Sequence, residues 1–193
     1  MEKIQMFSGE DLCNVELDNV IVNGYYDYFE ISNATINKCD FSKSTFQGID
    51  INNSIIKFSN FSNVDISSRS YKDVIFCECN LVGTDFNSSF FENAVFEKCN
   101  LTYSNFSSCN FKKVKFVSCR LDSSTFNEVK WKELEFDDCD MDETEFLHTK
   151  LKDLDFSNCK IKNLRVFVDQ LKGLVVNYEQ ALDLSLLLGI KIK

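Results

Sequence analysis

The residues that could carry chemistry in this chain are its nine cysteines, its single histidine and its thirty carboxylates. Six of the cysteines are separated by multiples of twenty residues, and Cys77 and Cys79 form a C-x-C pair. A zinc site needs four ligands that converge on one point, whereas side chains at one fixed interval form a straight column. We therefore predict no metal site and no cofactor. We interpret six thiols as small buried side chains: Cys39, Cys79, Cys99, Cys119, Cys139 and Cys159.

Catalytic groups are scarce in the sequence. His148 has no second histidine near it, and no Ser or Cys motif typical of an activated nucleophile accompanies it. Asp137 and Asp138 could form an acid–base pair, but neighbouring side chains on a strand diverge. We expect a convex surface without a cleft that could raise a carboxyl pKa. The chain is therefore predicted not to be an enzyme.

Composition narrows the class of partner. The chain has 193 residues, a net charge of −9 and no proline. An acidic chain lacks the basic surface that nucleic-acid binding needs, so no direct nucleic-acid partner is expected. No apolar run reaches the ~20 residues of a membrane span, and residues 1–10 contain no apolar signal segment. We expect a soluble cytoplasmic protein with reduced cysteines and no membrane partner.

A strict five-residue period organises the chain. Every fifth residue from Ile21 to Val176 is apolar or aromatic, and a smaller side chain recurs two residues before each. Neither a helix of 3.6 residues per turn nor an alternating strand explains this spacing. Five residues with two inward side chains describe one side of a square coil. The pattern predicts an all-β solenoid over 21–176, with 1–20 as an N-terminal cap whose Leu12, Val15, Leu17 and Val20 are out of register.

The cysteine spacing predicts the length of each coil. Twenty residues are four fives, so each coil has four faces and like residues stack on like. We expect about seven coils from Ile31 to Leu171 and a rod of roughly 34 Å at the strand spacing of ~4.8 Å. No register slip is expected. Arg69 occupies a small-residue position, and this predicts a local bulge or an outward turn.

The last segment, 177–193, reads as a separate C-terminal module of a helix and an added strand over 190–193. Asn177 is a good helix N-cap with Gln180 three residues later, and Gly189 can end the helix. Leucines cover almost every face of this short helix, so one face can close the solenoid while the others need a second partner. We predict a homodimer through Leu182, Leu186, Leu187 and Ile190; a buried monomeric cap is the alternative.

Charge is unevenly distributed. Residues 133–145 contain eight acids and no Lys or Arg, and the opposite face carries seven lysines: Lys112, Lys113, Lys130, Lys132, Lys150, Lys152 and Lys172. We expect the carboxylates to form a negative ridge that continues along the axis at the coil spacing and attracts a basic surface. The predicted target-binding patch is Asp122, Glu133, Glu135, Asp137, Asp138, Asp140, Asp142, Glu143 and Glu145. Simple solvation of the surface is the alternative interpretation.

These residues carry a family resemblance. The segments FSKSTF, CNLVGTDF, CNLTYSNF and CDMDETEF resemble the units of pentapeptide repeat proteins, across about Ile21–Val176. That resemblance implies a right-handed quadrilateral β-helix. The tail LKGLVVNYEQALDLSLLLGIKIK, with VKWKELEFDDCDMDETEF before it, resembles the Qnr-type quinolone-resistance proteins of Gram-positive bacteria and, more loosely, the mycobacterial MfpA.

The Qnr-type resemblance implies a function as well as a fold. It implies a dimeric rod that mimics duplex DNA, binds DNA gyrase or topoisomerase IV, and protects them from quinolones. Many Gram-negative relatives have projecting loops that contribute to protection, and this sequence lacks them. Two alternatives stay open: a scaffold that binds another basic protein, and an immunity protein against a gyrase-directed peptide toxin.

Overall fold

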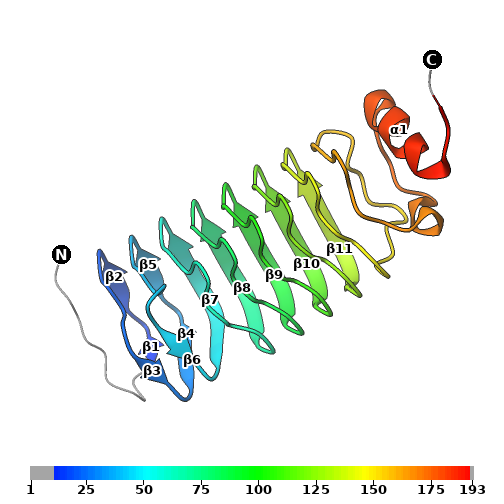
Figure 1. The fold of residues 1–193 in the computed structure, drawn as a ribbon. Coiled ribbons are helices and arrows are strands. Elements are labelled where there is room, and N and C mark those ends of the chain that lie inside the picture. The colour runs from blue at the N-terminus through cyan, green and yellow to red at the C-terminus, as the bar shows by residue number, and fades with distance from the viewer. Residues whose placement is uncertain (1–10, 192–193) are drawn as a thin grey trace.

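The structure, a computed structural model, describes residues 11–191 and shows a parallel β-solenoid with a short C-terminal helix, as predicted. Successive strands stack side by side into a rod, with the first strands at one end and the C-terminal helix at the other (Figure 1). The strands are β1 (Leu12–Cys13), β2 (Glu16–Asp18), β3 (Tyr25–Tyr26), β4 (Phe29–Ser32), β5 (Thr35–Asn37), β6 (Thr45–Phe46), β7 (Ile49–Lys57), β8 (Ser70–Cys77), β9 (Phe90–Glu97), β10 (Asn110–Val117) and β11 (Lys130–Asp137).

The twenty-residue coil is confirmed by the strand register. Phe111 pairs with Phe91 on one side and with Trp131 on the other, each twenty residues away. Stacked rings fill the interior: the centroids of Phe96 and Phe116 are 4.8 Å apart with nearly parallel planes. The apolar residue at the centre of each face is buried in almost every coil. Burial of these side chains is the main favourable contribution to the fold.

Most corners of the coil are made by a residue in the left-handed backbone region, two positions after the centre of a face. Twenty-five described residues other than glycine have a positive φ, among them Phe58 at 50° and Glu133 at 58°. A left-handed residue turns the chain without a loop, so five residues suffice for one side. Asn and Asp tolerate this conformation better than most side chains.

The expected register is wrong in the first coil. Leu12 pairs with Ile31 and Leu17 with Ile36, an offset of nineteen residues instead of twenty. Val22 is fully buried and Ile21 only half-buried, so Val22 takes the inward position. The first coil is one residue shorter than the others, and the difference lies at the corner of Gly24. A Cβ at Gly24 would stand 3.1 Å from the hydroxyl of Tyr26.

Pairing therefore reaches back to Leu12, upstream of the expected boundary at residue 21. Leu12 and Val20 are buried, and Val15 and Leu17 pack against the core, so these four belong to the first coil. They are one position out of register with the later series, as predicted. The remaining part of the expected cap, residues 1–10, lies outside the described residues.

Arg69 produces the outward turn but no bulge. The ladder keeps its twenty-residue offset on either side, with Ser70 opposite Phe90. The side chain leaves the core across Gly48, where a Cβ would stand 2.3 Å from the guanidinium carbon. Its Nη2 donates to the Gln47 carbonyl at 2.5 Å, and the guanidinium carbon lies 5.3 Å from the centroid of the Tyr28 ring. Because Gly48 has no Cβ, the arginine side chain fits at position 69, where other repeats have a small residue.

The C-terminal end departs from the repeat. Where the next face would hold a strand, the chain forms a 3₁₀ turn, η1 (Val168–Leu171), which the five-residue period did not predict. Asn177 then caps α1 (Tyr178–Ser185) with the expected reciprocal bonds to Gln180. A second 3₁₀ turn, η2 (Leu186–Leu188), ends at Gly189 with φ 74°, also as expected. Ile190 and Lys191 are not in a strand, and residues 192–193 of the expected strand lie outside the described residues.

No helix among residues 11–191 combines the length and apolar character that crossing a bilayer requires.

Candidate interaction surfaces

The eight acids of 133–145 lie on one coil and form what we call the acidic belt: Glu133, Glu135, Asp137, Asp138, Asp140, Asp142, Glu143 and Glu145. The belt crosses three consecutive faces, those centred on Phe136, Met141 and Phe146. Five of the eight side chains are exposed, and Asp140, Asp142 and Glu145 are half-buried. The carboxylates therefore encircle most of the rod at one level.

The expected negative ridge along the axis is wrong, because neighbouring coils place cations beside the belt. Asp140 pairs with Lys160 at 2.6 Å, and Glu135 pairs with Lys115 at 2.6 Å. The carboxylate of Asp140 raises the pKa of Lys160 through their hydrogen bond. Arg165 lies 3.9 Å from both Glu143 and Glu145. Asp122, one coil before, is 3.5 Å from Arg120.

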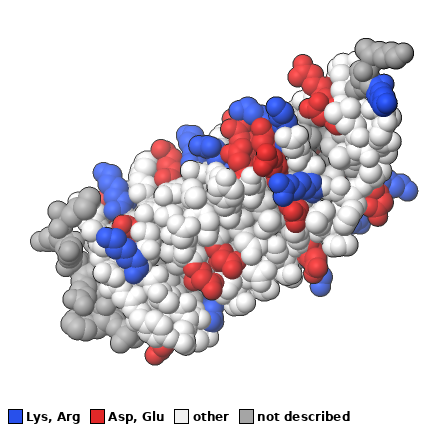
Figure 2. Space-filling view, viewed as in Figure 1, with Lys and Arg blue, Asp and Glu red and all other residues white. Residues whose placement is uncertain are grey.

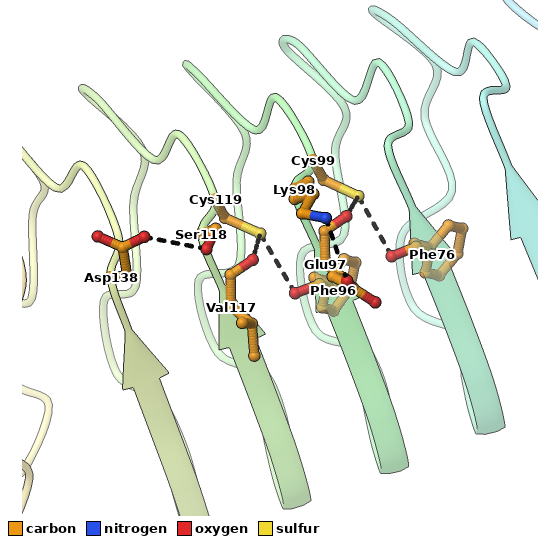
Figure 3. A network of polar contacts seen from close by, with 9 residues as sticks. All are labelled: Phe76, Phe96, Glu97, Lys98, Cys99, Val117, Ser118, Cys119 and Asp138. Carbon is orange, nitrogen blue, oxygen red and sulfur yellow. Dashed lines mark hydrogen bonds and ion pairs between the residues drawn. The ribbon is translucent and has the colours of Figure 1, made fainter.

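Belt carboxylates without a nearby cation accept hydrogen bonds from the adjacent coils. Asp138 accepts from the Ser118 hydroxyl at 3.1 Å, as Figure 3 shows, and Asp142 accepts from the backbone N–H of Lys162 at 2.8 Å. Asp137 accepts from the Asn158 amide. On the face drawn in Figure 2, one compact group of acidic side chains has basic side chains on both sides of it. The belt is thus a local negative zone within a mixed surface.

The lysine face has the axial repeat that the acids lack. Lys112 and Lys132 are direct partners in the ladder of β10 and β11, and Lys152 and Lys172 continue the column at twenty-residue intervals. Lys130 and Lys150 form a second, shorter column beside it, and Lys113 lies at a corner with φ 56°. Lys112 is paired with Glu92. The predicted lysine face is therefore present, and like charges adjoin along it.

The cysteine column is present and has a role in hydrogen bonding. Cys39, Cys79, Cys99, Cys119, Cys139 and Cys159 are all buried free thiols. Cys119 Sγ donates to the Phe96 carbonyl at 3.3 Å, and Cys99 does the same to Phe76 at 3.4 Å (Figure 3). Thr149 makes the equivalent bond to Phe126 on another face. A small donor at this position therefore satisfies an inward carbonyl of the preceding coil.

An apolar surface covers the C-terminal module. Leu182, Leu186, Leu187 and Ile190, the predicted dimerisation residues, are 37%, 57%, 43% and 49% exposed. Leu188 is 59% exposed beside them, whereas Leu184 packs against the solenoid core. One side of α1 and η2 thus closes the rod, and the other side leaves leucines exposed to solvent.

Trp131 and His148 depart from what the sequence predicts. Trp131, expected in the core, is half-buried, and its indole N–H donates to the Lys150 carbonyl at 2.7 Å. His148 is exposed at a corner, with its ring 5.2 Å from that of Phe167. Cavities open on this face, so the expectation of a uniformly convex surface is wrong here. The change from Phe111 to Trp131 at the centre of this face is the sequence feature that could have indicated the cavities.

The comparison with protein families agrees with the repeat architecture. A family described as "Pentapeptide repeat region" matches residues 69–138 and 111–179, which together span more than half of the chain. A search of curated proteins found no match.

The solved structures to which the chain is similar share little sequence with it. Full-length QnrB1, a plasmid-mediated fluoroquinolone resistance protein, is 20% identical, with 98% of this chain and 95% of that chain covered and a TM-score of 0.43. The pentapeptide repeat protein Rfr23 from the cyanobacterium Cyanothece 51142 is 14% identical, with 86% and 91% covered and a TM-score of 0.37.

Proposed function

The chain belongs to the pentapeptide repeat family, and from this premise we propose that it binds a type II topoisomerase, DNA gyrase or topoisomerase IV, as a mimic of duplex DNA. The observation that carries the proposal is the acidic belt, eight carboxylates on three faces of one coil next to the C-terminal module. A DNA-binding enzyme presents a basic surface that normally grips phosphates, and a dense group of carboxylates complements it. The chain then acts by binding and not by catalysis, in the cytoplasm where its target is found.

The exposed leucines of α1 and η2 support a twofold dimer as the form that binds. A C2 contact uses the same patch on both subunits, so Leu186 and Leu187 would cover each other's apolar surface. Because the acidic belt lies close to this end in sequence and along the rod, a dimer brings two belts toward the centre of a longer particle (Figure 1). Protection of the enzyme from quinolones follows if the particle displaces the DNA with which the drug acts.

A scaffold that binds another basic protein remains the second candidate, and the pairing of the belt favours it. Lys115, Lys160 and Arg165 neutralise part of the belt in the free protein. A mixed surface of this kind suits a partner recognised by specific charge pairs instead of a phosphate-binding channel.

Binding to purified gyrase tests the belt directly. The variant Glu133→Gln, Glu135→Gln, Asp138→Asn, Glu143→Gln removes four charges while each side chain keeps an acceptor oxygen. Asp65→Asn, Asp73→Asn, Glu78→Gln, Glu97→Gln removes the same charge outside the belt. We expect the belt variant to lose at least about tenfold in affinity, and the matched control less than about threefold. Equal affinities of the two variants would remove the belt from the interface.

A further inference from the structure

The lysine face contains a groove that the proposed function does not use. Two adjoining cavities of about 700 and 390 Å³ lie on it and share His148, Lys150 and Lys152. Ligand sites of roughly 300–1,000 Å³ hold small molecules. We call the two cavities together the lysine groove; its basic and aromatic lining residues are Lys130, Trp131, Lys132, His148, Lys150, Lys152, Phe167 and Lys172.

The groove exists because the strand ladder opens at Trp131. In other coils the backbone N–H of the central residue donates to the carbonyl nineteen positions later, as Phe126 does to Glu145 at 2.7 Å. At this face the corresponding carbonyl is that of Lys150, and the indole Nε1–H of Trp131 donates to it. One coil further, η1 replaces the strand. The next two faces, centred on Leu151 and Leu171, therefore hold no strand, and a hollow is left along the rod.

The amines of the groove are available to a ligand. Within residues 11–191, only Lys132 of the five groove lysines has a carboxylate within 4.0 Å, that of Glu133. Lys130, Lys150 and Lys152 are exposed and have no such partner in the described part of the chain. Three of the four carboxylates that line the groove, Glu128, Glu133 and Asp153, are corner residues with positive φ, so the lysines occupy the middle of the face. Asp169 in η1 is the fourth.

Aromatic surface lies beside these amines. Trp131 is half-buried in the wall, and Phe167 is 46% exposed with the His148 ring against it. Planar rings bind a nucleobase by stacking, and lysine amines bind phosphate as compact charges. The corner carboxylates would repel a phosphate chain that continued past the groove, which favours a short ligand over a nucleic acid.

We propose that the lysine groove binds a mononucleotide, with its phosphates at Lys150 and Lys152 and its base at the aromatic wall. The groove shares only Glu133 with the acidic belt, so variants at Lys150 and Lys152 test its occupancy without changing the belt. A nucleotide held there would also give this face of the rod a negative charge in place of a positive one.

Trp131 is the only tryptophan of the chain, so its fluorescence reports on the groove alone. We would titrate the full chain with ATP, adenosine, tripolyphosphate and a short single-stranded oligothymidylate, and follow each by fluorescence and by calorimetry. The test variant is Lys150→Glu/Lys152→Glu, with Lys150→Gln/Lys152→Gln as a milder form. The matched control is Lys43→Glu/Lys57→Glu, two exposed lysines outside the groove. Circular dichroism checks that each variant is folded.

We expect saturable ATP binding with a Kd below about 1 mM, at least tenfold weaker in the groove variants and unchanged in the control. Adenosine and tripolyphosphate should each bind at least about tenfold more weakly than ATP, because each lacks one half of the recognised ligand. The proposal is wrong if neither readout saturates with ATP, or if the control loses as much as the groove variants. Tripolyphosphate binding as tight as ATP, or binding of the oligonucleotide alone, would also overturn it.

Discussion

Gln170 and Gln180 close the C-terminal end of the solenoid by the same set of hydrogen bonds, ten residues apart. Gln170 Nε2 donates to the carbonyls of Phe146 and Thr149 at 2.9 and 2.7 Å. Gln180 Nε2 donates to those of Phe156 and Cys159 at 2.8 and 2.6 Å. Each Oε1 accepts the backbone N–H three residues earlier. In complete coils the next coil supplies these donors. At the end of the rod each glutamine supplies them instead, and this covers carbonyls of an otherwise open edge.

Removing the Gln180 amide should destabilise the fold. In Gln180→Ala the Cys159 carbonyl loses the Gln180 amide, and the Phe156 carbonyl keeps only the Cys159 N–H, which costs about 1–3 kcal/mol of unfolding free energy. Gln170→Ala should cost less, because Gln170 is only half-buried. Denaturant unfolding measures both, with Gln47→Ala, an exposed glutamine, as the control. A Gln180→Ala protein as stable as the control would contradict this role.

The left-handed corners predict stability changes of opposite sign. Phe58 is 49% exposed at φ 50°, so Phe58→Asn should raise the unfolding free energy by about 0.5–1 kcal/mol. Gly83 has φ 65°, and a Cβ there would stand 2.5 Å from Asn63 Oδ1. Gly83→Ala should therefore lower the unfolding free energy by about 1 kcal/mol. Thermal melts of the two variants should move in opposite directions, and a shift of the same sign would contradict the corner account.

Thiol labelling should separate the nine cysteines into three groups. Cys13 is exposed and should react with a thiol reagent at once, and half-buried Cys77 should react more slowly because burial raises its thiol pKa. Seven buried thiols should react only on unfolding; burial raises the pKa of Cys109 to about 12, so it stays protonated at neutral pH. Rapid native labelling of more than two thiols would show that the column is open.

Dimerisation through the C-terminal module predicts that Leu186→Glu gives monomers. Leu186 is 57% exposed, so the charge does not disturb the monomer core but would be buried without a partner in the dimer. Sedimentation velocity compares it with Tyr103→Glu, an equal charge change at a side chain that is 67% exposed on the solenoid. Dimers that persist in Leu186→Glu would place the interface elsewhere.

Much of the fold follows from the sequence because one interaction repeats. The period of five residues reflects one inward centre per face, and it predicts the centres of the faces from Tyr26 onward. The capping residues of α1 are also predicted. The period fails where a single residue alters a corner. Gly24 removes one position, and the four-residue step from Val22 to Tyr26 is invisible in a series that starts at Ile21.

The candidate surfaces were predicted less well than the fold. The acids of 133–145 do share one coil, but the ridge along the axis required like charges twenty residues apart. Position 160 is lysine opposite Asp140, and position 165 is arginine opposite Glu145, so the spacing itself indicated charge pairing. The lysine groove depends on the indole of Trp131 reaching the Lys150 carbonyl, a contact that periodicity does not reveal.

Gyrase supercoiling with and without ciprofloxacin tests the central claim most directly. The wild-type chain should inhibit supercoiling at high ratio to enzyme and, at lower ratio, restore activity in the presence of the drug. The belt variant should do neither at the same concentrations, while its charge-matched control behaves as wild type. A chain that neither inhibits the enzyme nor relieves the drug at any ratio would contradict the topoisomerase proposal and favour the scaffold.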